Sequence, residues 1–185
     1  YSIINAVSTT ARKIITLEDP VEYSISGISQ IPVNTTGGQS FGDNLRSVLR
    51  LDPDVLMIGE IRDADTAKTA IQASITGHLV LSSFHATSSA AAFSRMIDMI
   101  GVNPIFSSAI RLVIAQRLVR RLDDETKEEY EPDDATKRWV QDVLKDLPEN
   151  SERPDLDNFK LWRPVINERS PFGYKGRVVV MEQMV

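Results

Sequence analysis

Three short apolar segments of the sequence each end in side chains that can move a proton or contact a cation. Glu18 and Asp19 close the first segment, Glu60 closes the second and His85 closes the third. Carboxylates and an imidazole gathered in one place could hold a hydrated magnesium ion and orient a water for attack on a phosphoryl group. Carboxylates at the mouth of an apolar sheet are costly to desolvate unless a cation or hydrogen bonds compensate. If the segments are neighbours, these residues predict a crevice for a phosphate ester or a metal ion.

Each acid taken alone has a simpler interpretation as a helix cap or a turn residue. Asp19 followed by Pro20 is by itself an ordinary turn dipeptide. Three such segment ends in succession, with polar pairs at 62–63 and 82–83 beside them, favour the site over three separate caps.

Apolar patterns predict the strands that would position these side chains. Residues 13–17 form a β-branched run that Pro20 stops, residues 55–58 form a continuous apolar run, and residues 79–84 form the next buried strand. Residues 28–33 alternate between polar and apolar side chains, as a half-exposed strand does. Because ligands of open α/β sheets bind outside the carboxyl ends of the strands, the acids and the histidine would lie at the binding edge.

Helical spacing of apolar residues separates the strands, and residues 1–10 resemble the last turns of a helix. The expected helix starts are, in chain order, Ser40, Asp63 or Asp65, Thr87 or Ser88, and Pro104. The last helix would have Leu118 on its apolar side, and the basic cluster Arg117, Arg120 and Arg121 would suit its C-terminus through the helix dipole. Strands alternating with helices predict an α/β domain with a largely parallel sheet.

The alternation stops where an acidic stretch begins. Residues 123–170 are polar and irregular apart from a helix expected around 139–147, and residues 177–181 supply one more strand. We therefore predict an α/β core over residues 1–122, an acidic and partly helical insert over 123–170, and a returning strand of the same domain over 171–185.

Charge and composition limit the classes of partner. The net charge is −5 and residues 123–134 alone carry −7, so the remaining residues sum to +2 and offer no electrostatic case for nucleic-acid binding. The acidic stretch is most simply a solvated loop.

No apolar run approaches the roughly 20 residues that cross a bilayer, and the absence of cysteine excludes disulfides and cysteine-based zinc sites. We expect a soluble, intracellular protein.

Three sequence boxes follow one another along the chain: ITLEDPVEY at 15–23, LMIGEIRD at 56–63 and GHLVLSSFHA at 77–86. They resemble the aspartate, Walker B and histidine boxes of the secretion ATPase superfamily that drives type IV pili and type II secretion. Three further matching segments are LRSVLRLDPD (45–54), AQRLVRRL (115–122) and GYKGRVVVMEQM (173–184). The resemblance implies a RecA-like fold, with a mostly parallel sheet flanked by helices, that uses ATP and Mg²⁺.

The resemblance also implies a role for each matching side chain. Glu18 matches the glutamate that orients or deprotonates the attacking water, which requires an acceptor within about 3 Å of that water. Glu60 matches the Walker B glutamate, which acts on Mg²⁺ through its water ligands, so Glu60 and Glu18 are the candidate metal contacts and either is a candidate base. Asp19 would steady the loop or share the outer shell of the metal, and His85 would hydrogen-bond the γ-phosphate and report its loss.

His78 and the arginines near the boxes have weaker predictions. His78 lies seven residues before His85, about 20 Å along a strand, so the two imidazoles cannot bind one zinc ion together. It would face a neighbouring subunit or simply solvent. Arg62, Arg50 and Arg95 are candidates for ion pairs or a subunit interface, or are solvated surface arginines. The predicted cofactor-binding side chains are Asp19, Arg62 and His78.

Two departures from the family pattern affect the expected activity. The glycine loop GxxxxGK[ST], which in the family precedes the segment matching Tyr1, occurs nowhere in the sequence. Its backbone N–H groups and lysine supply most of the nucleotide affinity, so we expect this chain alone to bind ATP poorly and hydrolyse it negligibly. Many assembly-type members bind zinc through cysteines after the segment matching 115–122, where this sequence has the acidic insert, so no zinc is expected.

Taken together, the resemblance predicts a mechanical ATPase. Its subunits would form a hexameric ring, cytoplasmic and peripheral to the inner membrane, that turns a membrane platform protein of a type IV pilus or type II secretion machine. The insert at 123–170 and GYKGR at 173–177 favour the assembly or secretion branch over the retraction branch. The alternative is a non-catalytic docking or oligomerisation module, which the missing phosphate loop favours.

Overall fold

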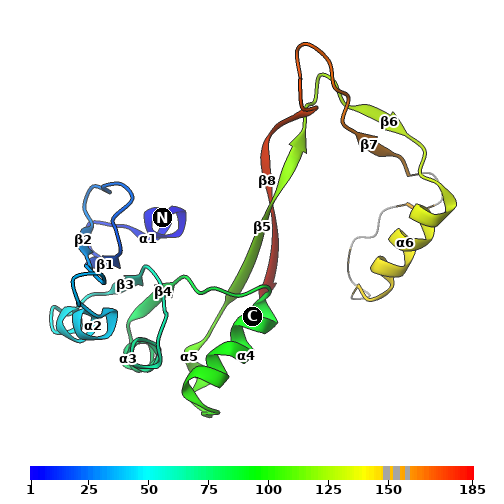
Figure 1. Cartoon of the computed structure of the whole chain (residues 1–185). Helices are drawn as coiled ribbons and strands as arrows, with labels where there is room; N and C mark the ends of the chain where they lie inside the picture. Colours follow the sequence, from blue (N-terminus) through cyan, green and yellow to red (C-terminus); the bar gives the residue numbers. More distant parts are fainter. Residues whose placement is uncertain (148–150, 152–154, 157–158) are drawn as a thin grey trace. The chain divides into compact units, whose positions relative to one another are not determined.

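The computed structural model divides the chain into two compact units (Figure 1). The first unit is made of Tyr1–Ala115 and Met181–Val185, and the second of Gln116–Val180. None of the helices that the structure describes is long and apolar enough to cross a membrane. The described residues are 1–147, 151, 155–156 and 159–185.

The first unit is built on a parallel sheet with the strand order β2-β1-β3-β4. The strands are β1 (Ile14–Glu18), β2 (Ser29–Pro32), β3 (Val55–Ile58) and β4 (Leu79–Ser82). Each neighbouring pair is parallel, which confirms the expected sheet type. The strands that carry Glu18, Glu60 and His85 at or near their ends, namely β1, β3 and β4, are adjacent.

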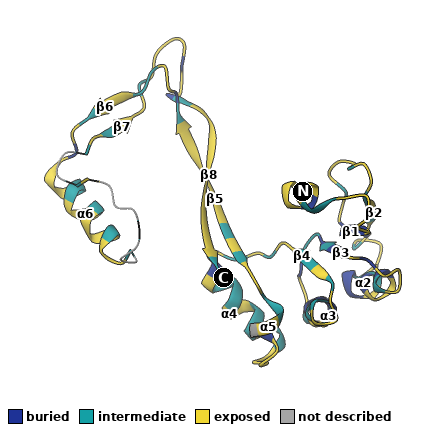
Figure 2. Cartoon of the chain, turned by 180° about the vertical axis from the view of Figure 1, so that it is seen from behind, coloured by how far each residue is buried: buried dark blue, intermediate teal, exposed yellow. Residues whose placement is uncertain are grey.

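Helices cover both faces of this sheet. The short helix α1 (Ser2–Val7) lies on one face, and α2 (Phe41–Leu49) and α3 (Ala64–Ile75) lie on the other. The two buried clusters are Ile4, Ile14 and Val55 on the α1 side, and Ile15, Leu17, Leu56, Ile58, Phe41, Leu45, Val48, Ala67 and Ala70 among others on the opposite side. Burial on both faces explains why β3 is a continuous apolar run and why β1 is apolar apart from Thr16 and Glu18 (Figure 2).

Three of the four expected helix starts are confirmed by their caps. The side chains of Ser40, Asp63 and Ser88 each accept a hydrogen bond from the backbone N–H three residues later. The helix that follows Ser88, α4 (Ser89–Ile100), ends at Gly101, whose φ of 84° is a conformation that glycine adopts without strain.

The strand predicted over residues 79–84 is confirmed at Leu79–Ser82, but its predicted burial is wrong. The strand β4 ends at Ser82, and its first residue, Leu79, keeps 46% of its surface exposed. Among the described residues β4 pairs only with β3, so it is an edge strand and its apolar side chains are incompletely covered.

The predicted helix from Pro104 to about Leu118 is also wrong. A single turn, α5 (Phe106–Ala109), is followed by the strand β5 (Val113–Leu122), which forms a two-stranded sheet with β8 (Tyr174–Met184). The apolar spacing fits a helix, but the β-branched residues of both segments favour a ladder, and their pairing overrides the local pattern.

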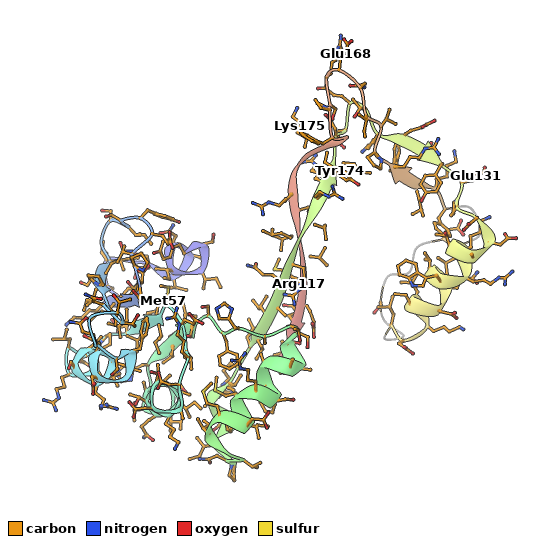
Figure 3. The ribbon with its side chains drawn as sticks, in the orientation of Figure 1. Met57, Arg117, Glu131, Glu168, Tyr174 and Lys175 are labelled. Atoms are coloured by element: carbon orange, nitrogen blue, oxygen red, sulfur yellow. The ribbon has the colours of Figure 1, made fainter. Side chains whose placement is uncertain are left out.

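The basic cluster predicted for a helix C-terminus therefore lies on a strand. Arg117, Arg120 and Arg121 all belong to β5. The guanidinium of Arg120 lies 4.2 Å from the ring centroid of Tyr174, which Figure 3 labels near the start of β8, and Arg121 forms an ion pair with Asp124. Arg120 and Arg121 are therefore stabilised by Tyr174 and Asp124, and not by a helix dipole.

The insert contains more structure than its composition predicts. The helix α6 (Asp134–Lys145) confirms the expected helix a few residues earlier, but β6 (Glu128–Tyr130) and β7 (Leu161–Arg163) form an unpredicted antiparallel pair. Cross-strand contacts stabilise the pair, since Arg163 Nη2 lies 2.9 Å from Glu128 Oε2. Such contacts need a register that a single sequence does not reveal. The rest of the insert prediction, at 148–150, 152–154 and 157–158, lies outside the described residues.

Candidate active site

The carboxyl ends of β1, β3 and β4 surround a cavity of about 340 Å³. Five of the side chains predicted from the sequence line it, namely Glu18, Asp19, Glu60, Arg62 and His85. The other lining residues are Tyr1, Pro20, Glu22, Phe41, Met57, Gly59 and Ser83. Met57, which Figure 3 labels, comes from the middle of β3. The parallel sheet order thus brings acids from two strands and an imidazole from a third to one place.

Glu60 is held between two cationic or proton-donating side chains. Its Oε2 accepts a hydrogen bond from Arg62 Nε at 2.6 Å, and its Oε1 lies 2.9 Å from His85 Nε2. The Glu60 side chain is 15% exposed, whereas that of His85 is 83% exposed. Ion pairs with such exposed partners contribute little to stability, so their main effect is to orient the carboxylate. The imidazole of His85 is thus largely open to solvent at the edge of the cavity.

Glu18 is buried and hydrogen-bonded on both carboxylate oxygens. It is the last residue of β1 and only 3% exposed. Oε1 accepts from the hydroxyl of Thr16 and from Gln30 Nε2 at 3.1 Å, while Oε2 accepts from the hydroxyl of Tyr1. These donors offset the cost of burying the carboxylate. Burial, and then the hydrogen bond to Glu18, raise the pKa of the Tyr1 hydroxyl above its ordinary value of 10.0, so the group stays protonated and able to donate.

Gly59 allows the segment that carries Glu60 to lie against β1. Its N–H donates to the carbonyl of Leu17 at 2.7 Å. A Cβ at this position would lie 3.0 Å from the Leu17 carbonyl oxygen and 3.4 Å from Glu18 Cα, which is closer than side chains ordinarily pack. The hydroxyl of Ser83 donates to the Gly59 carbonyl at 2.5 Å and ties β4 to the same point.

Asp19 and His78 occupy different places. Asp19 lines the cavity and accepts a hydrogen bond from the hydroxyl of Thr35. His78 follows the C-terminus of α3, where its Nδ1 lies 2.9 Å from the carbonyl oxygen of Ala73 and 3.3 Å from the hydroxyl of Thr76. His78 is therefore not among the side chains that line the cavity.

Arg95 holds the segment that ends in His85. Its Nη1 donates to the carbonyl of His85 at 2.8 Å, and its guanidinium lies 5.6 Å from the ring centroid of Phe84. Arg50, the other arginine considered from the sequence, is the C-cap residue of α2.

Sequence reasoning missed the residues that surround Glu18. A signal existed for Thr16, because residues two apart on a strand share a face of the sheet. Gln30 lies beside Thr16 in the β1–β2 register, which the sequence alone does not reveal. Tyr1 is brought to the site by α1 packing on that same face.

The donor set fits a magnesium ion that keeps most of its water ligands. Among the described residues, no group of three or more histidine or acidic side chains could hold a metal ion directly. The carboxylates of Glu18 and Glu60 already accept hydrogen bonds from the chain. Mg²⁺ in phosphate-transfer sites commonly takes one or two carboxylates, phosphate oxygens and several waters, so contacts through water suit this arrangement.

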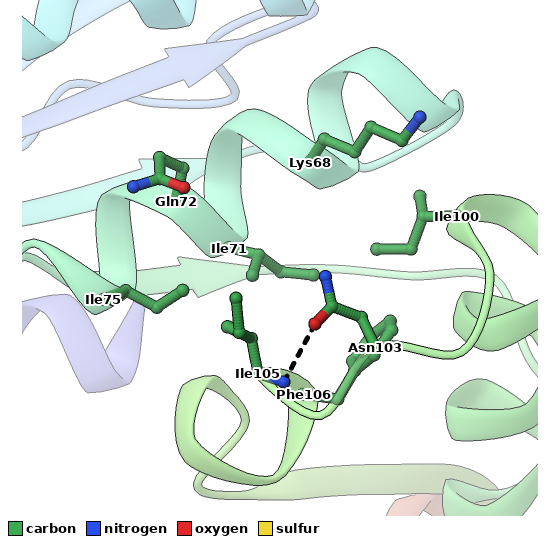
Figure 4. A pocket seen from close by; sticks show the side chains of 8 residues that line it. All are labelled: Lys68, Ile71, Gln72, Ile75, Ile100, Asn103, Ile105 and Phe106. Atoms are coloured by element: carbon green, nitrogen blue, oxygen red, sulfur yellow. Dashed lines mark hydrogen bonds between the residues drawn. The ribbon is translucent and has the colours of Figure 1, made fainter.

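A second cavity of about 200 Å³ lies between α3 and the segment around α5 (Figure 4). Asn103 accepts a hydrogen bond from the backbone of Ile105 there at 3.0 Å. The lining residues are Lys68, Ile71, Gln72, Ile75, Ile100, Asn103, Ile105 and Phe106. They include one cation and no acid or histidine, so this cavity lacks the groups for acid–base chemistry.

Comparison with known proteins identifies the family. The sequence model of the type II/IV secretion system protein family matches residues 1–185. The chain belongs to this family. Its relatives include type II secretion system protein E of Xanthomonas campestris pv. campestris, which is 40% identical over all of this chain and 31% of that protein. Another is the type IV pilus assembly ATPase PilB of Pseudomonas aeruginosa, 42% identical over 98% of this chain and 31% of that protein. The chain thus spans about a third of the length of these relatives.

A solved structure shares the fold of part of this chain, namely its α/β core. The pilus retraction motor PilT with bound ADP superposes with a TM-score of 0.57 at 33% identity, over 66% of this chain and 38% of that chain. The α/β fold of this secretion-family chain is accordingly RecA-like, as expected from its boxes.

Proposed function

We propose that this chain carries the catalytic carboxylates of a secretion-family ATPase, and that the intact protein hydrolyses ATP to power type IV pilus assembly or type II secretion. The observation that supports this most directly is the cavity at which Glu18, Glu60 and His85 meet from three adjacent strands. The relatives support the same reaction, since PilB of Pseudomonas aeruginosa is named as an ATPase and PilT was solved with ADP.

In this proposal each side chain of the cavity has a separate task. Glu18 orients or deprotonates the attacking water, because it is a buried carboxylate with a fixed orientation. Glu60 faces the water ligands of the metal, and Arg62 keeps its carboxylate in place. Mg²⁺, when bound, would neutralise the charge that develops on the phosphate oxygens. His85, exposed and paired with Glu60, would exchange that contact for the terminal phosphate.

The branch we propose is assembly or secretion rather than retraction. The alignments with protein E and PilB extend over 98–100% of this chain and so include the insert at 123–170. The superposition on the retraction motor PilT covers 66% of the chain. We also propose a hexameric ring on the cytoplasmic side of the inner membrane, in contact with a platform protein of the machine. Arg62 and His78 remain candidates for nucleotide or subunit contacts in that ring, and Asp19 for the outer shell of the metal.

Substituting Glu60 tests the proposed function in the full-length protein that contains this chain. Glu60→Gln keeps the size of the side chain but removes its charge, so we expect ATP hydrolysis to fall by at least about 100-fold. Ring assembly, measured by analytical ultracentrifugation, should not change. Glu131→Gln, a matched substitution at an exposed position next to β6, should keep the parent rate. Unchanged hydrolysis in Glu60→Gln would remove the site assignment.

The competing hypothesis is a non-catalytic docking or oligomerisation module, which the absence of a GxxxxGK[ST] motif from these 185 residues favours. It predicts that the full-length protein assembles normally but hydrolyses no ATP. A steady-state ATPase assay of that protein therefore separates the two functions.

A further inference from the structure

Gln30 connects Glu18 to the loop between β1 and β2. Its Nε2 donates to Glu18 Oε1 and to the carbonyl of Tyr23, both at 3.1 Å, and its Oε1 accepts from the backbone N–H of Ile25 at 2.7 Å. Both N–H donors of the amide and its oxygen are therefore engaged. Three such contacts fix the Gln30 amide in one orientation, and the amide in turn holds Glu18 Oε1 in place.

Thr16 binds the same oxygen from the adjacent position on β1. Its side chain is completely buried, and its hydroxyl donates to Glu18 Oε1. Thr16 and Gln30 are direct partners in the β1–β2 register, so their side chains reach Glu18 from neighbouring strands on one face of the sheet. Since a carboxylate oxygen has two favourable acceptor positions, two donors saturate Oε1.

Oε2 of Glu18 is left with one acceptor position. The hydroxyl of Tyr1 donates to it and in turn accepts from the backbone N–H of Glu22 at 3.2 Å. Tyr1 and Glu18 both line the cavity. The two oxygens of this carboxylate are thus unequal, because the chain fully occupies one and only partly occupies the other.

We propose that Gln30 and Thr16 are positioning residues that fix Glu18 through Oε1 and so reserve Oε2 for the attacking water. This inference rests on the proposed ATPase function. Neither residue touches the water or the nucleotide in this scheme, and both act through Glu18. Because an error of about 1 Å in the position of a catalytic group can reduce a rate by about 100-fold, removing one of two anchors should lower turnover without weakening nucleotide binding.

The test uses the full-length protein with conservative variants. Gln30→Met keeps the length of the side chain but removes its three hydrogen bonds, and Thr16→Val keeps its shape but removes the hydroxyl. We expect each to lower kcat about 10-fold with KM for ATP within about 2-fold of the parent, since the loss is confined to the chemical step. Thr16→Ser restores the donor and should recover most of kcat. Gln72→Met, on the exposed face of α3, is the matched control and should leave both constants unchanged.

A double-mutant cycle separates positioning from a general structural role. If Gln30 acts only through Glu18, Gln30→Met should lower kcat no further in a Glu18→Gln background. An equal loss in both backgrounds, or a normal kcat in both Gln30→Met and Thr16→Val, would overturn the inference while leaving the proposed function intact. A parent protein that assembles but does not hydrolyse ATP would instead overturn the proposed function, and this inference with it.

Discussion

Replacing Gly59 by alanine would place a methyl group against the backbone of β1, next to Glu18. The new Cβ would lie 3.0 Å from the Leu17 carbonyl oxygen and 3.4 Å from Glu18 Cα. Both are main-chain atoms of a completely buried strand, so they cannot rotate away as a side chain would. The strands must separate by a few tenths of an ångström, and the 2.7 Å hydrogen bond from Gly59 to Leu17 must lengthen.

Two opposing terms set the size of the effect. Overpacking of this kind destabilises the folded state by about 1–3 kcal/mol. Alanine also reduces the entropy of the unfolded chain, which stabilises the folded state by about 0.4–1 kcal/mol. We therefore expect a net loss of about 1.5 kcal/mol in the free energy of unfolding. Because the separation acts where Glu60 is aligned with Glu18, turnover in the full-length protein should fall by about 10-fold or more.

Gly42→Ala is the informative comparison, because its new Cβ meets a closer atom but a more mobile one. Asp65 Oδ2 would lie at 2.1 Å, yet it is the end of an exposed side chain that can swing away. The lost ion pair with Arg46 is worth at most about 1 kcal/mol, and alanine in the helix α2 returns about as much. Urea denaturation should show Gly42→Ala within about 0.5 kcal/mol of the parent. If Gly42→Ala is instead the less stable of the two variants, the distinction between backbone and side-chain contacts fails.

Three further predictions concern helix caps, acid and nucleotide. Asp63→Ala should lower the free energy of unfolding by about 2 kcal/mol, because the cap of α3 is lost and the hydroxyl of the completely buried Thr66 loses its acceptor. The control Asp65→Ala should lower it by at most about 1 kcal/mol, and equal losses in urea denaturation would contradict this. Hydrogen bonds from Thr136 hold the pKa of Asp133 below its ordinary value of 3.8, so its stabilisation of α6 is complete above about pH 4 and is lost as the pH falls through that lowered pKa. Asparagine caps a helix about as well but does not titrate, so Asp133→Asn should lose less helix on acidification. A circular-dichroism titration from about pH 6 to about pH 2 in which the parent and Asp133→Asn lose equal amounts of helix would refute this. The isolated 185-residue chain should bind Mg·ATP no more tightly than about 1 mM by calorimetry, and micromolar affinity would contradict the expected role of the missing phosphate loop.

The sequence predicts this fold best where one physical requirement dominates. The strands β1 and β3 are buried on both faces, and their short runs of apolar and β-branched residues predict such strands. The caps at Ser40, Asp63 and Ser88 follow from the need of each helix for a side-chain acceptor. Prediction fails at β5, where the same apolar spacing suits a helix and a strand and a partner more than 50 residues away decides.

The candidate site follows the same division. The meeting of Glu18, Glu60 and His85 could be expected because the ends of adjacent parallel strands lie at one edge. The hydrogen bonds of Gln30 to Glu18 and of Arg62 to Glu60 could not, because they depend on strand register and on side-chain rotamers. The roles of these residues in catalysis remain predictions for the experiments described above.

The two outer strands of the sheet differ in how open they are to further pairing. β2 contains Pro32, which lacks an N–H and so discourages another strand from docking, whereas β4 has the sequence Leu-Val-Leu-Ser with no proline or charge. In the described part of the chain, the outer backbone of β4 has no strand beside it. A further strand, from the same polypeptide or from a second molecule, would therefore pair with β4 and not with β2. When the 185 residues are produced alone, this side is where self-association should begin, and a lysine on β4 is the substitution most suited to preventing it.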